Sequence, residues 1–375
     1  MEPSGVAVPA TLHRFTKSTA LVATLALVAA CSPGASPSAP PAATPAGAST
    51  APTVEPSEAA APALFHIVGD APVIERTIVP DRGAVLPGAV AVDADGTYHA
   101  WVIAFADTPG TQDLHHLTSD DAVTWTVQLD DSLEGLSEGF GNPGALPASV
   151  IQDGDDWVMY LTGTLASERA GWDIWRATAP GPDGPWTRGD EPVLRRGPAG
   201  AWDSGGLDFP SVIPLAEGGW AMFFSGIDPA HPEGGAVGRA TSDDGIEWTK
   251  DDDDATTDAR LAESDPVVEP GLCGGFDTRA VHQPRVLAAA DNTVMAYAGY
   301  AGDNESRPQV GYADSLDEGA TWGCEWPNPA LNTATLPEGG IHTIVAFQRG
   351  DRLALLVEWL TNDGTDDWLA EFGMG

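Results

Sequence analysis

A proline and a tryptophan recur at an almost constant separation along this chain. Four segments begin at a proline, continue through a hydrophobic stretch and end at a tryptophan: Pro87 to Trp125, Pro147 to Trp186, Pro210 to Trp248, and Pro284 to Trp322. The separations are 38, 39, 38 and 38 residues. A repeat of this length predicts copies of one small structural unit, each of which buries its hydrophobic faces against its neighbours.

Each unit contains several short strands. One strand follows the repeat proline, a Gly/Asp turn leads to a second strand such as 157–163 or 220–226, and a third strand such as 237–242 precedes an acidic turn. Glycine and proline supply 43 and 32 of the 375 residues, which favours short strands and turns over long helices. Four antiparallel strands in a unit of about 60 residues predict an all-β fold, a β-propeller in which each unit is one blade.

A fifth unit starts at Gly340 and continues through Trp359, but the next repeat tryptophan would fall beyond residue 375. This unit therefore lacks its outer strand. Residues 72–80 precede the first blade and have no blade of their own, so we predict that they supply this strand. The sequence thus predicts a five-bladed β-propeller over residues 64–375, with its last blade closed by an N-terminal strand, which removes an exposed sheet edge.

Two segments precede the predicted propeller. Arg14 and Lys17 stand before an apolar run that ends in small residues and Cys31, a pattern similar to a bacterial lipobox. We expect a lipoprotein signal peptide at 1–30 with lipidation of Cys31, and the alternative is an ordinary signal peptide. Residues 31–63, rich in Ala, Pro, Ser and Thr, are expected to be an extended tether. The expected localisation is the outer face of a bacterial membrane, with the lipid as the only membrane contact.

Export implies an oxidising compartment, in which the two remaining cysteines are expected to pair. Cys273 and Cys324 are 51 positions apart, and no Cys-x-x-Cys or Cys/His zinc spacing is present. A disulfide that closes such a loop is expected to stabilise the fold by roughly 4 kcal/mol.

The charge of the chain excludes two classes of partner. There are 55 acidic residues against 17 Lys and Arg, which gives a net charge of −38. Nucleic acids and anionic membrane surfaces are both bound through clustered cations, which this chain lacks. The acidity itself is compatible with a salty habitat, cation binding or solubility.

The acidic turns and one loop carry a resemblance to known families. The turn Ser315–Trp322 is similar to the Asp-box, S-x-D-x-G-x-T-W, of sialidases and other propellers, in which the Asp binds backbone N–H groups. The segments 201–206, 209–213 and 238–248 resemble the five-bladed superfamily of arabinanases, β-xylosidases, levansucrases and invertases, over about 310 residues of this chain. The resemblance implies a glycoside hydrolase-like protein that acts on or binds an oligo- or polysaccharide in a funnel on the propeller axis.

In that superfamily, acidic residues at the starts of the inner strands supply the proton donor and the base or nucleophile. The matching positions, two before each repeat proline, are Val85, Ala145, Asp208 and His282. Only Asp208 is acidic, so two of the three expected carboxylates are missing from the family positions, and whether the protein is an enzyme stays open.

We expect Asp208 and His282 to be the catalytic pair, with His282 as a non-standard acid. The candidates for contact with the sugar lie at or near the same strand starts: Trp202 as a stacking platform, Asp203, Arg279, Arg285 and His342. The alternative role for Asp208 is to cap a strand or to pair with Arg279 or Arg285. The resemblance implies no cofactor except a candidate Ca²⁺ on the axis, and the run 251–254 is expected to be a solvated loop.

Three functions fit these observations. The first is a surface-anchored glycoside hydrolase-like enzyme, of which a sialidase is a weaker variant because no tyrosine nucleophile is apparent. The second is a non-catalytic glycan-binding lipoprotein. The third is a propeller scaffold that binds another protein. In each case we expect a monomer.

Overall fold

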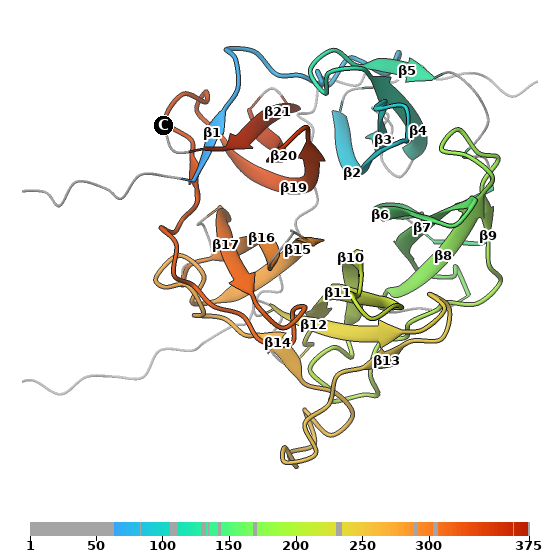
Figure 1. Cartoon of the computed structure of the whole chain (residues 1–375), viewed down its shortest axis with the longest axis vertical. Helices are drawn as coiled ribbons and strands as arrows, with labels where there is room; N and C mark the ends of the chain where they lie inside the picture. Colours follow the sequence, from blue (N-terminus) through green and yellow to red (C-terminus); the bar gives the residue numbers. More distant parts are fainter. Residues whose placement is uncertain are drawn as a thin grey trace, which may run out of the picture. The chain divides into compact units, whose positions relative to one another are not determined.

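The computed structural model describes residues 64–373, apart from gaps at 83, 106–111, 129–132, 134, 142–143, 168–170, 230–234, 289–291, 303–306 and 363. The predicted signal peptide, Cys31 and the tether lie outside the described residues. No helix occurs in the described part of the chain, so none there could cross a membrane. The described strands form five sheets arranged around one axis as a five-bladed β-propeller (Figure 1).

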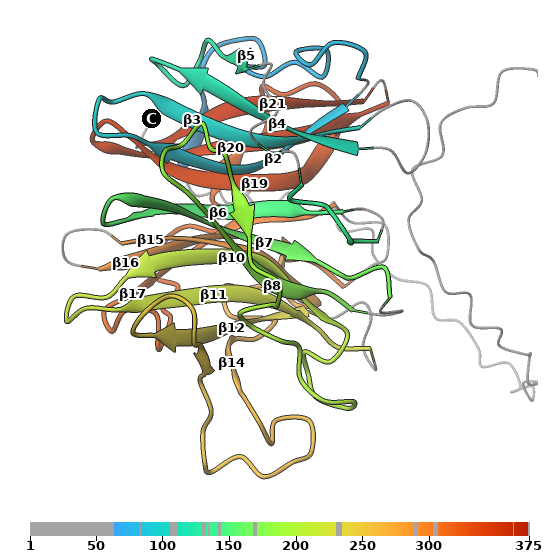
Figure 2. The same cartoon turned by 90° about the vertical axis from the view of Figure 1, so that its right-hand side faces the viewer.

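The first three blades follow the predicted pattern of four consecutive antiparallel strands. Blade one contains β2 (Ala84–Val92), β3 (Tyr98–Phe105), β4 (Gln112–Ser119) and β5 (Thr126–Gln128). Blade two contains β6 (Leu146–Asp153), β7 (Asp156–Gly163), β8 (Asp173–Ala179) and β9 (Thr187–Arg188). Blade three contains β10 (Gly206–Pro214), β11 (Trp220–Ile227), β12 (Gly235–Ser242) and β13 (Thr249–Lys250), and an additional strand, β14 (Pro266–Val268), pairs with β12. The segment between β13 and β14 projects from blade three (Figure 2).

Blade four has three strands, namely β15 (Ala280–Ala288), β16 (Thr293–Tyr300) and β17 (Gln309–Ser315). A disulfide joins Cys273, before β15, to Cys324, after β17, with 5.4 Å between their Cα atoms. Asp314 and Gly323 form an isolated bridge close by. The disulfide therefore fastens the outer segment of a blade that lacks a regular fourth strand.

Blade five contains β19 (Gly340–Arg349), β20 (Arg352–Thr361), β21 (Gly364–Phe372), β1 (Phe65–Ile67) and β18 (Leu331–Asn332). β1 pairs antiparallel with β21 and parallel with β18. An N-terminal strand thus closes the last blade as predicted, but the residues are 65–67 instead of 72–80. In 72–80 only Val73 and Ile74 bond to the β21 backbone, after which the chain turns, with the Ile78 N–H donating to the Glu75 carbonyl at 2.9 Å. Phe65, fully buried against Tyr312 and Phe372, anchors the closing strand.

The hydrophobic core consists of layers between neighbouring blades. Val158 and Tyr160 of β7 pack toward blade three, whereas Met159 and Leu161 of the same strand pack toward blade one. Middle strands are therefore buried on both faces, which is why they read as almost continuous apolar runs.

The acidic turns and their tryptophans are structural. Asp317 accepts hydrogen bonds from the backbone N–H (2.8 Å) and the hydroxyl (2.7 Å) of Thr321, and Trp322 packs edge-on against Phe223 of the preceding blade. Asp121 and Asp244 make equivalent backbone bonds, which lower the pKa of both carboxyls.

The inner strands β2, β6, β10, β15 and β19 line the axis (Figure 1). In each, the pairing with the second strand shifts register at the repeat proline or its equivalent. In blades three and four, Phe209 and Gln283 adopt left-handed φ values of 49° and 55° directly before the proline. A bulge of this kind changes the direction of a side chain, so candidate site residues are expected at these positions of the inner strands.

Candidate functional site

Three predicted site residues lie at the bulges of consecutive inner strands: Asp208 on β10, His282 on β15 and His342 on β19. Gln283 joins these strands through its backbone and its amide. Its N–H donates to Ser225 Oγ (2.9 Å), and Ser225 lies opposite Asp208 in the sheet. Its Oε1 accepts a bond from Thr343 Oγ1 (3.0 Å), and its Nε2 donates to the His342 carbonyl oxygen (3.1 Å). The strands that carry the three residues are therefore held together near the axis.

Asp208 is buried with an unusual proton affinity. Its side chain is 6% exposed, and burial raises its pKa to about 6. Hydrogen bonds from the Phe209 N–H (2.7 Å) and Thr162, together with the Arg285 charge, act in the opposite direction but are weaker than the effect of burial. Asp208 can therefore give up or take a proton close to neutral pH, as a general acid or base requires.

Arg285 crosses the axial region, where it bonds to two other blades. It is 3% exposed, and it donates from Nε to the Ile344 carbonyl (2.7 Å) and from Nη1 to the Ala148 carbonyl (2.7 Å). Its guanidinium carbon lies 5.4 Å from the centre of the Phe209 ring. These donors tie blade four to blades five and two, which is the structural role of Arg285 in this fold, and its contact with a sugar stays a prediction.

His282 is a poor candidate for the catalytic acid. Burial lowers its pKa to about 4, so the ring is neutral near pH 7 and cannot donate a proton as imidazolium. The ring packs edge-on against Tyr300 at 5.7 Å and against Gly235, where a Cβ would lie 2.2 Å from it. This burial does not favour His282 as the acid, and its catalytic role stays a prediction.

His342 is the most accessible of the three axial residues, since its side chain is 51% exposed. Its Nδ1 lies 2.7 Å from Oε2 of Glu358, which is 2% exposed, and this hydrogen bond raises the pKa of His342. Glu358 lies opposite Asp367 in the β20–β21 pairing. Burial, and then the Glu358 charge, raise the pKa of Asp367 well above its usual value. Neither Asp367 oxygen has a hydrogen-bond partner among the described residues.

The Glu358–Asp367 pair was not predicted from the sequence, because neither residue lies at the start of an inner strand. The pair lies on the second and third strands of blade five, close to β2 of blade one. Thr365, on the same face of β21 as Asp367, donates to the Val85 carbonyl (3.4 Å). Val85 holds the blade-one position where a carboxylate was expected. One signal was available: Glu358 is a single acidic residue in an otherwise apolar strand.

Trp202 and Asp203 hold their loop onto blade three. Trp202 is 1% exposed, stacks on Phe224 at 6.1 Å and donates from Nε1 to the Ser264 carbonyl (2.9 Å). Asp203 is fully buried in an ion pair with Lys250. The Asp203 charge is thus already paired, and the Trp202 ring stacks on Phe224 but also lines a cavity of about 400 Å³. Contact of these two residues with a sugar stays a prediction.

Beside the axial residues lies this cavity of about 400 Å³, between the end of β11, the start of β12 and the residues just before β15. Arg279 is on its wall, as is Arg260, whose Nε is 2.9 Å from Oδ2 of Asp228. Gly235 lines the cavity and also contacts His282, so the cavity adjoins the axial site. Its volume lies in the range of small-ligand sites.

The residues around Asp208 do not fit the Ca²⁺ ion that the resemblance implies. Ca²⁺ takes six to eight oxygen ligands. Asp208 instead faces a buried guanidinium and accepts a backbone N–H, and both of these repel or exclude a cation.

The fold matches solved carbohydrate-active proteins. No protein-family model matches the sequence, and no curated protein sequence matches it. A β-1,2-mannobiose phosphorylase from Listeria innocua has a TM-score of 0.59 at 13% identity, over 83% of this chain and 97% of that chain. A thermostable family-43 glycoside hydrolase has a TM-score of 0.53 at 17% identity, over 78% and 90% of the two chains.

An exo-1,5-α-L-arabinanase from a bovine ruminal metagenomic library has a TM-score of 0.51 at 14% identity, over 77% of this chain and 93% of that chain. At such identities the likeness concerns the fold alone. The resemblance stated from the sequence is confirmed at that level: the chain has the five-bladed propeller fold of these glycoside hydrolases.

Proposed function

We propose that the protein binds an oligo- or polysaccharide at the axial end of blades three to five and cleaves a glycosidic bond there. The observation that carries this proposal is the buried Asp208 with a pKa of about 6, at the start of an inner strand. A carboxyl group with this proton affinity is the usual acid of glycoside hydrolysis. The fold neighbours, which are carbohydrate-processing enzymes, support the same class of substrate.

The roles can be assigned to two groups. Asp208 gives its proton to the leaving glycosidic oxygen as the bond to the anomeric carbon breaks. The His342–Glu358 pair accepts the proton of the attacking water: His342 Nδ1 is held by Glu358, so Nε2 is the basic atom. Glu358 then stabilises the imidazolium that forms. The missing blade-one carboxylate is thus replaced by a base supplied from blade five.

The 400 Å³ cavity favours a second candidate, a glycan-binding protein without catalysis. Among the described residues that line this cavity, Asp228 is the only acidic one, and it is paired with Arg260. A sugar bound there would meet hydrogen-bond donors but no pair of carboxyl groups.

A polysaccharide panel separates the candidates. Wild type, Asp208→Asn and His342→Gln are tested for glycan binding and for release of new reducing ends, with the exposed Asp190→Asn as the control. If the protein is a hydrolase, wild type and the control release new reducing ends, and the rate of this release falls more than about 100-fold in both site variants. Binding without release supports the second candidate. If no glycan is bound and none is cleaved, both candidates are overturned, and the protein-binding scaffold remains.

The proposed location is the outer face of a bacterial membrane, through a lipid on Cys31. The Cys273–Cys324 disulfide supports export, because such bonds persist in oxidising compartments. Mass spectrometry of the protein extracted from membranes tests the lipid, and Cys31→Ser should release the protein into the soluble fraction. A variant that stays in the membrane fraction would contradict the anchor.

A further inference from the structure

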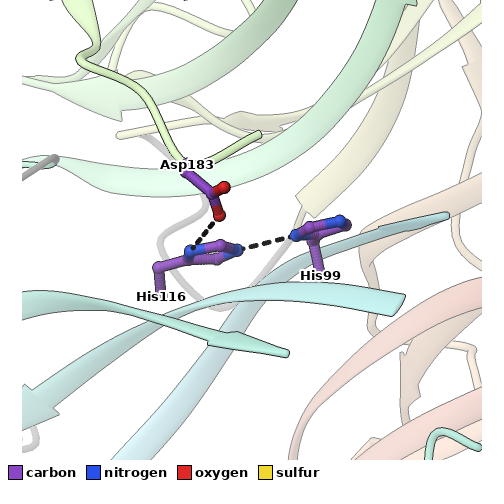
Figure 3. Close-up of side chains that lie close together, drawn as sticks. All are labelled: His99, His116 and Asp183. Atoms are coloured by element: carbon purple, nitrogen blue, oxygen red, sulfur yellow. Dashed lines mark hydrogen bonds and ion pairs between the residues drawn. The ribbon is translucent and has the colours of Figure 1, made fainter. Parts of the chain in front are cut away.

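A cluster of two histidines and an aspartate lies between blades one and two, away from the axial site (Figure 3). His99 is on β3 and His116 on β4, and both lie on the sheet face that packs against blade two, since His116 pairs with Trp101 and His99 is two residues before it. Asp183 comes from the turn between β8 and β9 of blade two. The cluster therefore joins side chains of two blades.

The three side chains are close enough to hold one ion. His99 Nδ1 lies 2.9 Å from His116 Nε2, and His116 Nδ1 lies 3.4 Å from Asp183 Oδ1. Taking one ligand atom from each residue, all three atoms lie within 4.8 Å of one another. The His99 and His116 side chains are buried, whereas that of Asp183 is 70% exposed.

The histidines are held in fixed orientations. His99 Nε2 donates a hydrogen bond to Asp93 Oδ2 (3.2 Å), which leaves the Nδ1 lone pair directed into the cluster. Asp93 is itself fixed by the N–H of Thr97 at 2.8 Å. Trp101 stacks on His116 at 5.4 Å, and Trp157 packs edge-on against His99 at 5.9 Å. A carboxylate behind an imidazole, with the ring clamped by its surroundings, is the usual support of a metal-binding histidine.

We propose that His99, His116 and Asp183 form a zinc site that fastens blade one to blade two. Two imidazoles and one carboxylate are ligands that Zn²⁺ accepts, and Asp183 opens the site to water, which can complete the coordination. Two nitrogens 2.9 Å apart, each about 2.1 Å from an ion, subtend about 90°. A tetrahedral ion would separate them to about 3.4 Å, a shift of a few tenths of an ångström.

Binding requires one rearrangement in the site. The ion takes the place of the proton shared between His99 Nδ1 and His116 Nε2, and the His116 proton moves to Nδ1, next to Asp183. The exposed Asp183 carboxylate turns toward the ion, and the two buried rings separate by a few tenths of an ångström. The site is independent of the proposed glycan chemistry.

The test is titration of the whole propeller with Zn²⁺, and with Co²⁺ as a spectroscopic probe, in millimolar Mg²⁺. The chain has a net charge of −38, and Mg²⁺, which prefers oxygen ligands, competes with Zn²⁺ for nonspecific binding to the surface carboxylates. Asp183→Asn removes an exposed ligand without disturbing the core, and Asp190→Asn, an exposed carboxylate nearby in sequence, is the matched control. His116→Gln removes a nitrogen ligand.

We expect one Zn²⁺ per chain and a Co²⁺ absorption spectrum typical of nitrogen ligands. Asp183→Asn should weaken Zn²⁺ binding at least about ten-fold, and Asp190→Asn should leave it unchanged. Free Zn²⁺ at about 100 times its Kd should raise the Tm by about 4 °C in wild type and the control. No stoichiometric binding in Mg²⁺, or equal affinity of Asp183→Asn and Asp190→Asn, would overturn the site, and this result does not depend on whether His116→Gln folds.

Discussion

Asp208 is expected to lower the stability of the protein while it serves the site, and Asp208→Asn exposes this cost. An aspartate in an unfolded chain has a pKa of about 3.9, whereas burial raises the pKa of Asp208 to about 6. At pH values above 6 the folded protein must keep an ionised carboxylate in a buried site. Each factor of ten in proton affinity corresponds to about 1.4 kcal/mol, so the ionised form costs roughly 3 kcal/mol.

The sign follows from linkage. The folded state binds the Asp208 proton more tightly than the unfolded state, so its contribution is fully present below about pH 4 and is lost as the pH rises through about 6. Asparagine has nearly the shape of a protonated aspartate and never ionises. Asp208→Asn should therefore match wild type near pH 4 and be more stable by roughly 3 kcal/mol near pH 7.5. For a propeller of about 310 residues this is a rise in Tm of about 4–5 °C.

Differential scanning calorimetry at several pH values between about 4 and 8 measures this difference, with Asp190→Asn as the control. The same Asp208→Asn protein should have lost glycan cleavage. A stability difference that does not change with pH, or a variant less stable than wild type near pH 7.5, would refute the argument that burial sets the proton affinity of Asp208.

Three other outcomes are expected. Replacing both Cys273 and Cys324 by serine should lower stability by up to about 4 kcal/mol and the Tm by about 6 °C in calorimetry, and an unchanged Tm would show that the bond does not restrain the unfolded chain. Because Glu358 raises the pKa of His342, this pair should stabilise the fold below about pH 6.5 and lose its effect as the pH rises through the raised value. His342→Gln should therefore destabilise near pH 5.5 and not near pH 9 in urea titrations. Trp202→Leu should cost about 3 kcal/mol of stability in urea titrations. Because Trp202 lines the 400 Å³ cavity, unchanged glycan binding by the folded variant would support the axial site, and weaker binding would support a glycan in the cavity.

The fold could be predicted from the sequence because the signals that define it are local and repeated. The proline marks the bulge of each inner strand, and the tryptophan marks the acidic turn and the layer between blades, so their spacing reports the length of a blade. The closing strand has no such repeat. Phe65 was missed because a three-residue strand leaves no periodic pattern, while the longer segment 72–80 resembled a strand more closely.

The candidate site was predicted less well because it depends on contacts between blades. Trp202 stands in a glycine-rich loop and reads as exposed. In the fold its ring fills space left by Gly226 and Gly238, where a Cβ would lie 2.0 and 2.8 Å from it. Arg285 reads as a ligand-binding cation, yet carbonyl oxygens of two other blades use its donors. Nothing in the sequence indicates that blades far apart in the chain supply those partners.

The pairing of β1 with β21 also has a consequence for how the protein folds. Phe65 lies opposite Phe372, 307 residues later, so the ring cannot shut until nearly the whole propeller sequence is available. Blades one to four are built from strands close in sequence and can form first, whereas the final closure joins the most distant segments and should set the folding rate. Until then, the free edge of β21 is open to pairing with another chain. A high concentration of newly made copies should therefore favour assemblies in which one copy's Phe65–Ile67 completes the fifth blade of its neighbour.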